Sequence, residues 1–292
     1  MLLASIPSPS SGNVHLGPFT VHMYGLMLLL GIAAAIGLTG LRWTRRGGDW
    51  DLVFQAAVWG VAFGVVGARA YHDVTSWDEV PHTWWGPFAV WQGGLGIWGG
   101  VALGAAAGAF VVRRAGASVA LMLDCVAPAL LLAQGIGRWG NWWNQELFGR
   151  PTDLPWGLEI DPAHRPDRYL SRATFHPTFL YEFLWDVLGA GVLLLAGRRF
   201  RIRPPALFAL YVCVYTFGRT FEELLRVDPS HHVLGERLNF WVSLAVFAAG
   251  ACAFVWLQLL RPDAGAPLAA GRRRPSRRGG MSVPRGRVRP RR

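Results

Sequence analysis

Seven long apolar segments constrain this chain more than any other feature of its sequence. A helix that crosses a bilayer needs about 20 mainly apolar residues, and a soluble core does not need seven such runs. The sequence therefore predicts an all-α polytopic membrane protein with about seven transmembrane helices. The expected spans lie near residues 21–41, 52–72, 95–112, 119–136, 177–197, 204–222 and 237–260.

The charges between these segments predict how the protein is oriented. Arginines follow the first, third and fifth segments, whereas the loop after the second contains Asp73, Asp78 and Glu79 and no arginine. Short loops rich in arginine stay in the cytoplasm. We therefore expect the N-terminus outside, the C-terminus in the cytoplasm, and the polar segment near 137–176 outside. The first segment is not read as a cleaved signal peptide, because residues 1–41 carry no charge.

The C-terminal residues 261–292 form a separate basic tail. They contain eleven arginines and one acid, Asp263, whereas the other 260 residues carry 18 arginines and 17 acids. Their Gly, Pro and Arg content predicts a disordered cytoplasmic segment after a transmembrane domain of residues 1–260. Such a run can bind nucleic acid. Beside a membrane helix we expect anionic lipid as its partner, and no nucleic acid.

Composition also narrows the chemistry. The chain contains no lysine, which excludes Schiff-base and lysine general-base mechanisms. Cys125, Cys213 and Cys252 show no metal-ligand spacing and are interpreted as small core residues, so neither metal nor cofactor is expected. The glycines within 60–70 and 93–100 favour close helix packing.

The polar motif GRWGNWWNQELFG, residues 137–149, directly follows the fourth apolar segment. An arginine in mid-bilayer costs roughly 2.5–3.5 kcal/mol, so its presence at the edge of the membrane suggests a function. A guanidinium group beside amides and indoles suits a phospholipid headgroup. The alternative is an interfacial aromatic belt with incidental polar residues. The polar residues of the motif are Arg138, Asn141, Asn144, Gln145 and Glu146.

Further polar blocks occur where other segments meet the outer face. VHMYG contains Tyr24, WQGGLGIWGG contains Gln92, and HPTFLYE contains His176 and Tyr181. Directly after Tyr181, two acids spaced by four residues, Glu182 and Asp186, need either a cation or a proton inside a membrane.

The last block is YTFGRTFEELLR. Its spacing predicts that Arg219, Glu223 and Arg226 share one helix face, with Tyr215 one turn below Arg219. A structural salt-bridge ladder would explain that pattern. With Arg138 converging from the fourth segment, the ladder is more typical of a phosphate clamp steadied by an acid.

Together these blocks resemble the prolipoprotein diacylglyceryl transferases. GRWGNWWNQELFG closely resembles the signature of that family, and VHMYG, WQGGLGIWGG, HPTFLYE and GRTFEELLR resemble its other blocks in the same order, over about residues 15–260. The resemblance implies seven spans in the bacterial plasma membrane. It implies transfer of a diacylglyceryl group from phosphatidylglycerol to the lipobox cysteine thiol of a prolipoprotein, the first step of lipoprotein maturation. The products would be a thioether and glycerol phosphate.

The resemblance and the chemistry of the side chains give the expected site. Arg138 and Arg219 would stabilise the charge on the leaving phosphate, and a field of arginines would favour the thiolate. Many family members have a histidine where this chain has Trp98, so the base is open. The expected catalytic residues are Arg138, Arg219, Glu223, Tyr24 and Asn141. The expected substrate-binding residues are Arg138, Asn144, Glu146, Gly149, His176, Tyr181, Tyr215 and Arg226.

A lipid carrier or transporter without enzymatic activity could use the same clamp to hold a headgroup. Transporters often show internal repeats and polar groups near the midplane. This chain shows no repeat, and its polar blocks gather at one membrane face. The sequence therefore favours the transferase.

Overall fold

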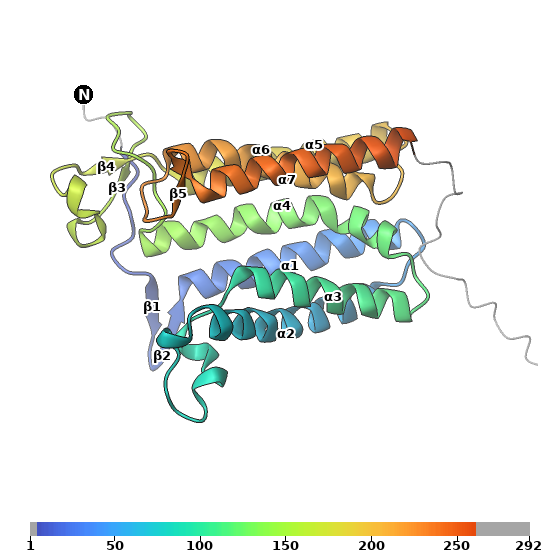
Figure 1. Cartoon of the computed structure of the whole chain (residues 1–292), viewed down its shortest axis with the longest axis horizontal. Coiled ribbons are helices and arrows are strands. Elements are labelled where there is room, and N and C mark those ends of the chain that lie inside the picture. The colour runs from blue at the N-terminus through green and yellow to red at the C-terminus, as the bar shows by residue number, and fades with distance from the viewer. Residues whose placement is uncertain (1–4, 261–292) are drawn as a thin grey trace, which may run out of the picture.

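The computed structural model describes residues 5–260, and within them seven α-helices run side by side as one bundle (Figure 1). The predicted basic tail, residues 261–292, lies outside the described residues. The helices are α1 (Met23–Thr44), α2 (Trp50–Thr75), α3 (Ile97–Arg114), α4 (Val119–Asn144), α5 (Thr178–Arg199), α6 (Ala206–Leu225) and α7 (Leu238–Val255). A π-helical turn, Trp256–Leu260, continues α7.

The prediction of a helical membrane protein is confirmed, and that of seven spans only in part. Five helices are long and apolar enough to cross a membrane: α1, α2, α4, α5 and α7 with its continuation. Of the other two, α6 carries Arg219, Glu222 and Glu223 in its last two turns, and α3 is 18 residues long and ends in Arg113 and Arg114. Both still pack lengthwise in the bundle (Figure 1).

The largest difference from the expected boundaries is at the end of α4. The fourth span was expected to end near residue 136, with residues 137–149 outside it. Instead the helix continues to Asn144. Polar residues suggested an exit from the membrane, but every residue from 137 to 144 remains helical. Arg138 and Asn141 are therefore held on a rigid helix, and the loop after α4 begins only at Gln145.

Two kinds of packing hold the bundle together. Helix α4 lies between α1 and the group formed by α5, α6 and α7 (Figure 1), and its residues Cys125 and Leu131 are fully buried. Helices α2 and α3 approach through glycines, as predicted. A Cβ added to Gly67 would lie 2.4 Å from the carbonyl oxygen of Gly99, so no larger residue fits there. Of the three cysteines only Cys125 is buried, because Cys213 is half-buried and Cys252 is exposed.

Three small antiparallel hairpins gather at one end of the bundle, at the left of Figure 1. β1 (Asn13–Leu16) pairs with β2 (Phe19–His22), β3 (Leu158–Glu159) with β4 (Thr174–Phe175), and β5 (His232–Val233) with β6 (Glu236–Arg237). Short 3-10 helices lie in the loop between α2 and α3, at Trp77–Glu79, Gly86–Phe88 and Val90–Gln92, and in the segment between β3 and β4, at Pro162–His164 and Asp167–Tyr169.

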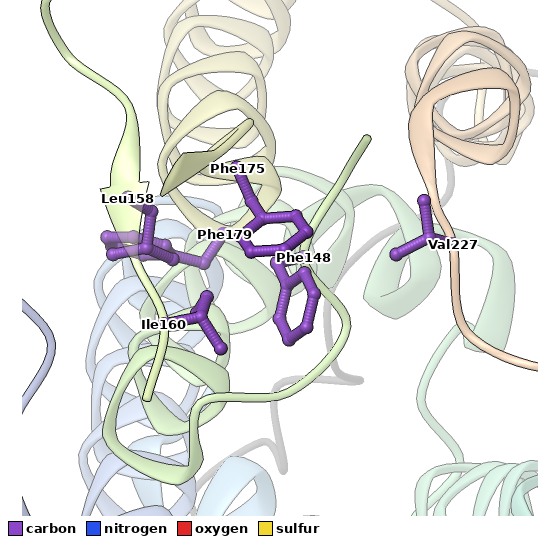
Figure 2. Close-up of a cluster of buried hydrophobic side chains, with 6 residues drawn as sticks. All are labelled: Phe148, Leu158, Ile160, Phe175, Phe179 and Val227. Atoms are coloured by element: carbon purple, nitrogen blue, oxygen red, sulfur yellow. The ribbon is translucent and has the colours of Figure 1, made fainter. Parts of the chain in front are cut away.

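An apolar cluster fastens the loop after α4 to the ends of α5 and α6 (Figure 2). The rings of Phe148 and Phe175 lie 4.8 Å apart. Burying such side chains stabilises the fold by roughly 1.5–3 kcal/mol each. The loop thus forms a fixed cap over the helix ends that carry the polar motif. The members of the cluster are Phe148, Leu158, Ile160, Phe175, Phe179 and Val227.

Candidate active site

The end of α4 presents the first part of the site. Arg138 and Asn141 lie three residues apart on the helix, and Arg138 Nη1 is 3.5 Å from Asn141 Oδ1. The helix stops where Gln145 takes a left-handed conformation, with φ of 52°. The buried amide of Gln145 then donates to Asp161 Oδ2 at 2.6 Å and accepts from the Asp161 backbone N–H at 2.7 Å. Gln145 therefore fixes the turn and leaves the polar residues before it on rigid backbone.

Two arginines from different helices converge on one carboxylate. Arg138 of α4 forms an ion pair with Oε1 of Glu182, which projects from α5, and Arg219 Nη1 of α6 lies 3.7 Å from Oε2. The Glu182 side chain is 6% exposed, and neither of its oxygens accepts a well-aligned hydrogen bond from the described residues. The sequence left open whether a cation or a proton accompanies Glu182, and the structure places two arginines beside it. Asp186, the second acid of that pair, is buried and has no hydrogen-bond partner among residues 5–260.

Two carboxylates of its own helix, α6, also bind Arg219. Its Nη1 donates to Glu222 Oε2 at 2.5 Å, and its Nη2 donates to Glu223 Oε1. The carboxylate of Glu223 is fully buried. Three carboxylates thus surround one guanidinium group, which fixes its direction.

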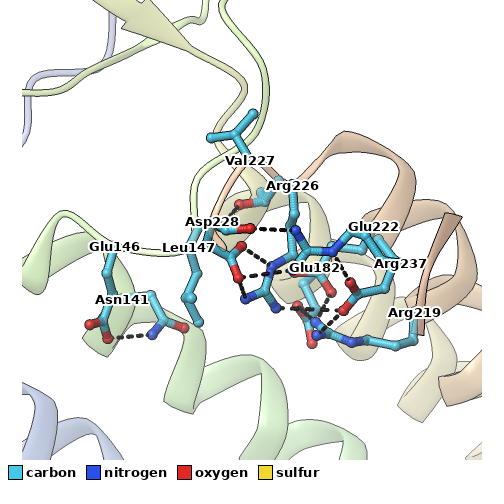
Figure 3. A network of polar contacts seen from close by, with 12 residues as sticks. Asn141, Glu146, Leu147, Glu182, Arg219, Glu222, Arg226, Val227, Asp228 and Arg237 are labelled. Atoms are coloured by element: carbon cyan, nitrogen blue, oxygen red, sulfur yellow. Dashed lines mark hydrogen bonds and ion pairs between the residues drawn. The ribbon is translucent and has the colours of Figure 1, made fainter. Parts of the chain in front are cut away.

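Sequence reasoning missed three members of this network, Glu222, Arg237 and Asp228 (Figure 3). Arg237, the residue just before α7, donates from Nε to Glu223 Oε2 at 2.6 Å and from Nη2 to Asp228 Oδ2 at 2.9 Å. Burial alone would raise the pKa of Asp228, but the hydrogen bonds and charges of Arg226 and Arg237 outweigh burial and hold that pKa below its usual value. One signal in the sequence could have identified Arg237, because an arginine directly before an apolar span is unusual.

The prediction that Arg226 shares a helix face with Arg219 and Glu223 is wrong. The helix ends at Leu225, and Arg226 is extended, with φ of −65° and ψ of 147°. Arg226 therefore turns to Asp228, with hydrogen bonds of 2.7 and 3.0 Å, and lies 3.7 Å from Glu223. We call the connected set the arginine–acid cluster. Its members are Arg138, Glu182, Arg219, Glu222, Glu223, Arg226, Asp228 and Arg237.

A second polar group lies beside this cluster. Asn141 Nδ2 donates to Glu146 Oε1 at 2.8 Å, and Asn144 Nδ2 lies 3.5 Å from the same oxygen. Tyr24 packs against this part of α4, because a Cβ added to Gly140 would lie 2.6 Å from Tyr24 Cδ2. The long Arg138–Asn141 contact joins this group to the cluster. Figure 3 shows the Asn141–Glu146 pair set apart from Arg219 and its partners.

His176 and Tyr181 form a third group rather than joining the arginines. His176 Nδ1 lies 3.2 Å from the Tyr181 hydroxyl, which also accepts a hydrogen bond from Trp156. Burial lowers the pKa of His176. Gly149 is placed by backbone contacts, since its N–H donates to the His176 carbonyl oxygen at 2.9 Å and a Cβ there would lie 2.7 Å from His176 Cβ.

Two hollows adjoin these groups. A cavity of about 320 Å³ lies between α5 and α6. Its walls are mainly apolar, yet Glu182, Arg219 and the predicted Tyr215 also line it. Around it, Phe217 and Phe221 are exposed on the outside of the bundle. A second, polar hollow of about 440 Å³ is lined by residues 9–13, Asn144 and Glu146.

Among residues 5–260 no three His, Cys, Asp or Glu side chains gather to hold a metal ion.

Comparison with known proteins agrees with this arrangement. The family model described as prolipoprotein diacylglyceryl transferase matches residues 12–256. That match covers most of the chain, and with it all the groups described above. The chain belongs to this family. It is therefore a membrane-embedded transferase of lipoprotein biosynthesis.

Individual relatives support the same assignment, and the following three carry the name phosphatidylglycerol–prolipoprotein diacylglyceryl transferase. The chain is similar to the protein of Frankia alni, with 50% identity over 86% of this chain and 67% of the relative. It is 49% identical to enzyme 2 of Streptomyces coelicolor, over 87% and 82% of the two chains. It is also 49% identical to the protein of Cutibacterium acnes, over 87% of each.

Proposed function

We propose that the chain transfers the diacylglyceryl group of phosphatidylglycerol to the lipobox cysteine thiol of prolipoproteins, forming a thioether and releasing glycerol phosphate. One observation carries the proposal: Arg138 and Arg219, from two helices, face a single anionic group beside an apolar cavity. A phosphodiester linked to acyl chains has the same combination of one negative charge and an apolar body.

The arginines suit the leaving group of this reaction. As sulfur attacks the glyceryl carbon, negative charge grows on the phosphate ester oxygen. Guanidinium groups fixed before the reaction stabilise such charge, typically by a few kcal/mol for each donor. Because Arg219 is held by Glu222 and Glu223, little reorganisation is needed to keep it in place. Glu223 is thus assigned the role of orienting Arg219.

The remaining predicted residues are assigned to binding. Asn144 and Glu146 line the polar hollow, where the glycerol headgroup or the peptide would meet amide and carboxylate groups. Asn141 donates to Glu146, and Tyr24 packs against the same part of α4. Tyr215 lines the apolar cavity with Arg219. Arg226, His176, Tyr181 and Gly149 lie where the cap meets α5 and the end of α6.

The proposal includes the placement of the protein in the membrane. We assign seven spans to the bacterial plasma membrane, with the N-terminus outside and the basic tail facing anionic lipid in the cytoplasm. The position of the charges supports this orientation. Arg42, Arg113 and Arg198 lie in the last turns of α1, α3 and α5, at the opposite end from the hairpins and the polar motif (Figure 1).

A transfer assay in detergent tests the function. The purified chain should move a labelled diacylglyceryl group from phosphatidylglycerol to a lipobox peptide, and Arg138→Ala should abolish the transfer. Arg172→Ala is the matched control, because Arg172 forms an exposed pair with Asp153 away from the cluster. A chain that binds phosphatidylglycerol but transfers nothing would instead be a lipid carrier.

A further inference from the structure

Glu182 differs from the other carboxylates of the arginine–acid cluster. It alone reaches arginines on two other helices, and its oxygens accept no well-aligned hydrogen bond among the described residues. We propose that Glu182 is the base that takes the proton of the cysteine thiol, an inference that rests on the proposed function. We further propose that the phospholipid itself activates this base by taking its arginine partners.

The neighbouring acids accept hydrogen bonds from arginines, whereas neither oxygen of Glu182 accepts one from residues 5–260. Glu222 accepts a hydrogen bond of 2.5 Å from Arg219. Glu223 accepts hydrogen bonds from Arg219 and Arg237. Hydrogen bonds to the charged form of a carboxylate lower its affinity for a proton. The arginines that face Glu182 lie on α4 and α6, whereas Arg219 holds Glu222 and Glu223 within α6 itself.

The other groups that face Glu182 do not supply a better base. Arg138 of α4 and Arg219 of α6 stay charged and donate only. Tyr215 of α6 lines the same cavity, but a phenol is neutral at physiological pH and holds its proton. Asp186, one turn further along α5, is buried, and no hydrogen bond from residues 5–260 stabilises its charged form. His176 is bound to Tyr181.

Phosphate binding would change the proton affinity of Glu182. In the free protein the two arginines favour the carboxylate form of Glu182, whereas burial and the neighbouring carboxylate of Glu222 oppose it. When a phosphate takes the arginines, the Glu182 carboxylate loses its cations, stays almost fully buried, and gains a second negative neighbour beside Glu222. Burial and a like charge both favour protonation of an acid. The base therefore becomes stronger once the lipid substrate has bound.

The resulting step is balanced. The thiol S–H proton moves to a carboxylate oxygen of Glu182, and the sulfur electron pair forms the bond to the glyceryl carbon. The bond between that carbon and the phosphate ester oxygen breaks, and its electron pair remains on glycerol phosphate between Arg138 and Arg219. When glycerol phosphate leaves, it or water carries the proton away, and Glu182 pairs with the arginines again.

Two peptides with different nucleophiles distinguish a catalytic base from an acid that has only a structural role. Glu182→Gln keeps the size of the side chain but cannot take a proton. With a cysteine lipobox peptide its kcat should fall by about 10²- to 10⁴-fold, the usual contribution of a general base. With the same peptide containing selenocysteine, whose selenol is already ionised at neutral pH, the loss should shrink to less than about tenfold, because no base is needed. Asp186→Asn, the matched change one turn away, should keep kcat within a few-fold of wild type with both peptides.

Lipid binding supplies a second readout that does not depend on turnover. Glu182→Gln removes the anion that competes for Arg138 and Arg219, so phosphatidylglycerol should bind to it at least as tightly as to the wild type. Glu182→Asp, which retains a carboxylate, should transfer to cysteine better than Glu182→Gln.

Three results with Glu182→Gln would overturn the inference: an equal loss of kcat with the cysteine and the selenocysteine peptide, a wild-type kcat with the cysteine peptide, or a loss of phosphatidylglycerol binding. A loss of kcat that selenocysteine rescues in Asp186→Asn, but not in Glu182→Gln, would also overturn it. If the wild-type protein transfers nothing, the proposed function fails and the inference fails with it. If the wild type is active and Glu182→Gln matches it, only the inference fails.

Discussion

Arg237 donates a hydrogen bond of 2.6 Å from its Nε to Oε2 of Glu223, which ties the start of α7 to the last turn of α6. Glu223 in turn accepts from Arg219. The direction of Arg219 therefore depends on a residue from another helix, which makes Arg237 a positioning residue for the proposed phosphate clamp.

Arg237→Gln should weaken both the fold and the reaction. Removing Arg237 takes one cation from the buried Glu223 and from Asp228, and leaves them to Arg219 and Arg226. We expect a lower Tm in detergent and a lower kcat with little change in the KM for peptide. Arg172→Ala, in the exposed pair, should change neither. Unchanged kcat in a folded Arg237→Gln protein would remove Arg237 from the positioning role.

Lysine should not replace the arginines of the clamp. Arg138→Lys and Arg219→Lys keep a positive charge but lose the planar fork that meets two oxygens at once. We expect both variants to rescue transfer poorly, and both alanine variants to lose about 10²- to 10³-fold or more in kcat. Circular dichroism and membrane insertion should stay normal. Near-normal turnover in either alanine variant would contradict the assignment.

The imidazole of His176 should not be required. Its pKa is lowered by burial, and its Nδ1 lies 3.2 Å from the Tyr181 hydroxyl. Gln at this position keeps a hydrogen-bonding group, so His176→Gln should retain measurable transfer. Tyr24→Ala, Asn141→Ala and Glu223→Ala should each lose far more.

The pH profile gives a check on that prediction. If His176 were the base, the wild-type rate would show an acidic limb at or below pH 6.5, the usual imidazole value. That limb would disappear in His176→Gln together with activity. Observing both would make His176 the base and exclude Glu182.

Acid should weaken the junction of α6 and α7 through Asp228. The folded-state pKa of this carboxyl lies below its usual value, because Arg226 and Arg237 outweigh the effect of burial. Asp228 therefore stabilises the fold above its unfolded pKa, about 3.9, and this contribution is lost as the pH falls through the folded pKa. Asp228→Asn should lower Tm at pH 7, and the difference from wild type should shrink below about pH 4. A difference that stays constant down to pH 3 would show that charge is not the cause.

The basic tail should not contribute to catalysis. The orientation expected from the sequence places residues 264–292 across the membrane from the proposed site. A chain without them should transfer at the wild-type rate in detergent, as measured with a lipobox peptide. A folded but inactive truncated chain would show that the tail has another role.

The sequence predicted the helices well because their apolar lengths are set by bilayer thickness. The end of α4 was missed because polar residues were taken to mark an exit from the membrane, although a helix can carry them into a buried cluster. The pairing of Arg138 with Glu182 needed the packing of α4 against α5, which no spacing rule supplies. Arg237 and Asp228 were missed for a related reason: they meet Glu223 and Arg226 only because the chain turns irregularly after Leu225.

The position of the phosphate tests the account most directly. A structure of the protein with phosphatidylglycerol should show the phosphate between Arg138 and Arg219, with the Glu182 carboxylate turned away from both and the acyl chains leaving through the apolar cavity between α5 and α6. A phosphate bound instead in the polar hollow beside Asn144 and Glu146, with the Arg138–Glu182 pair intact, would contradict it.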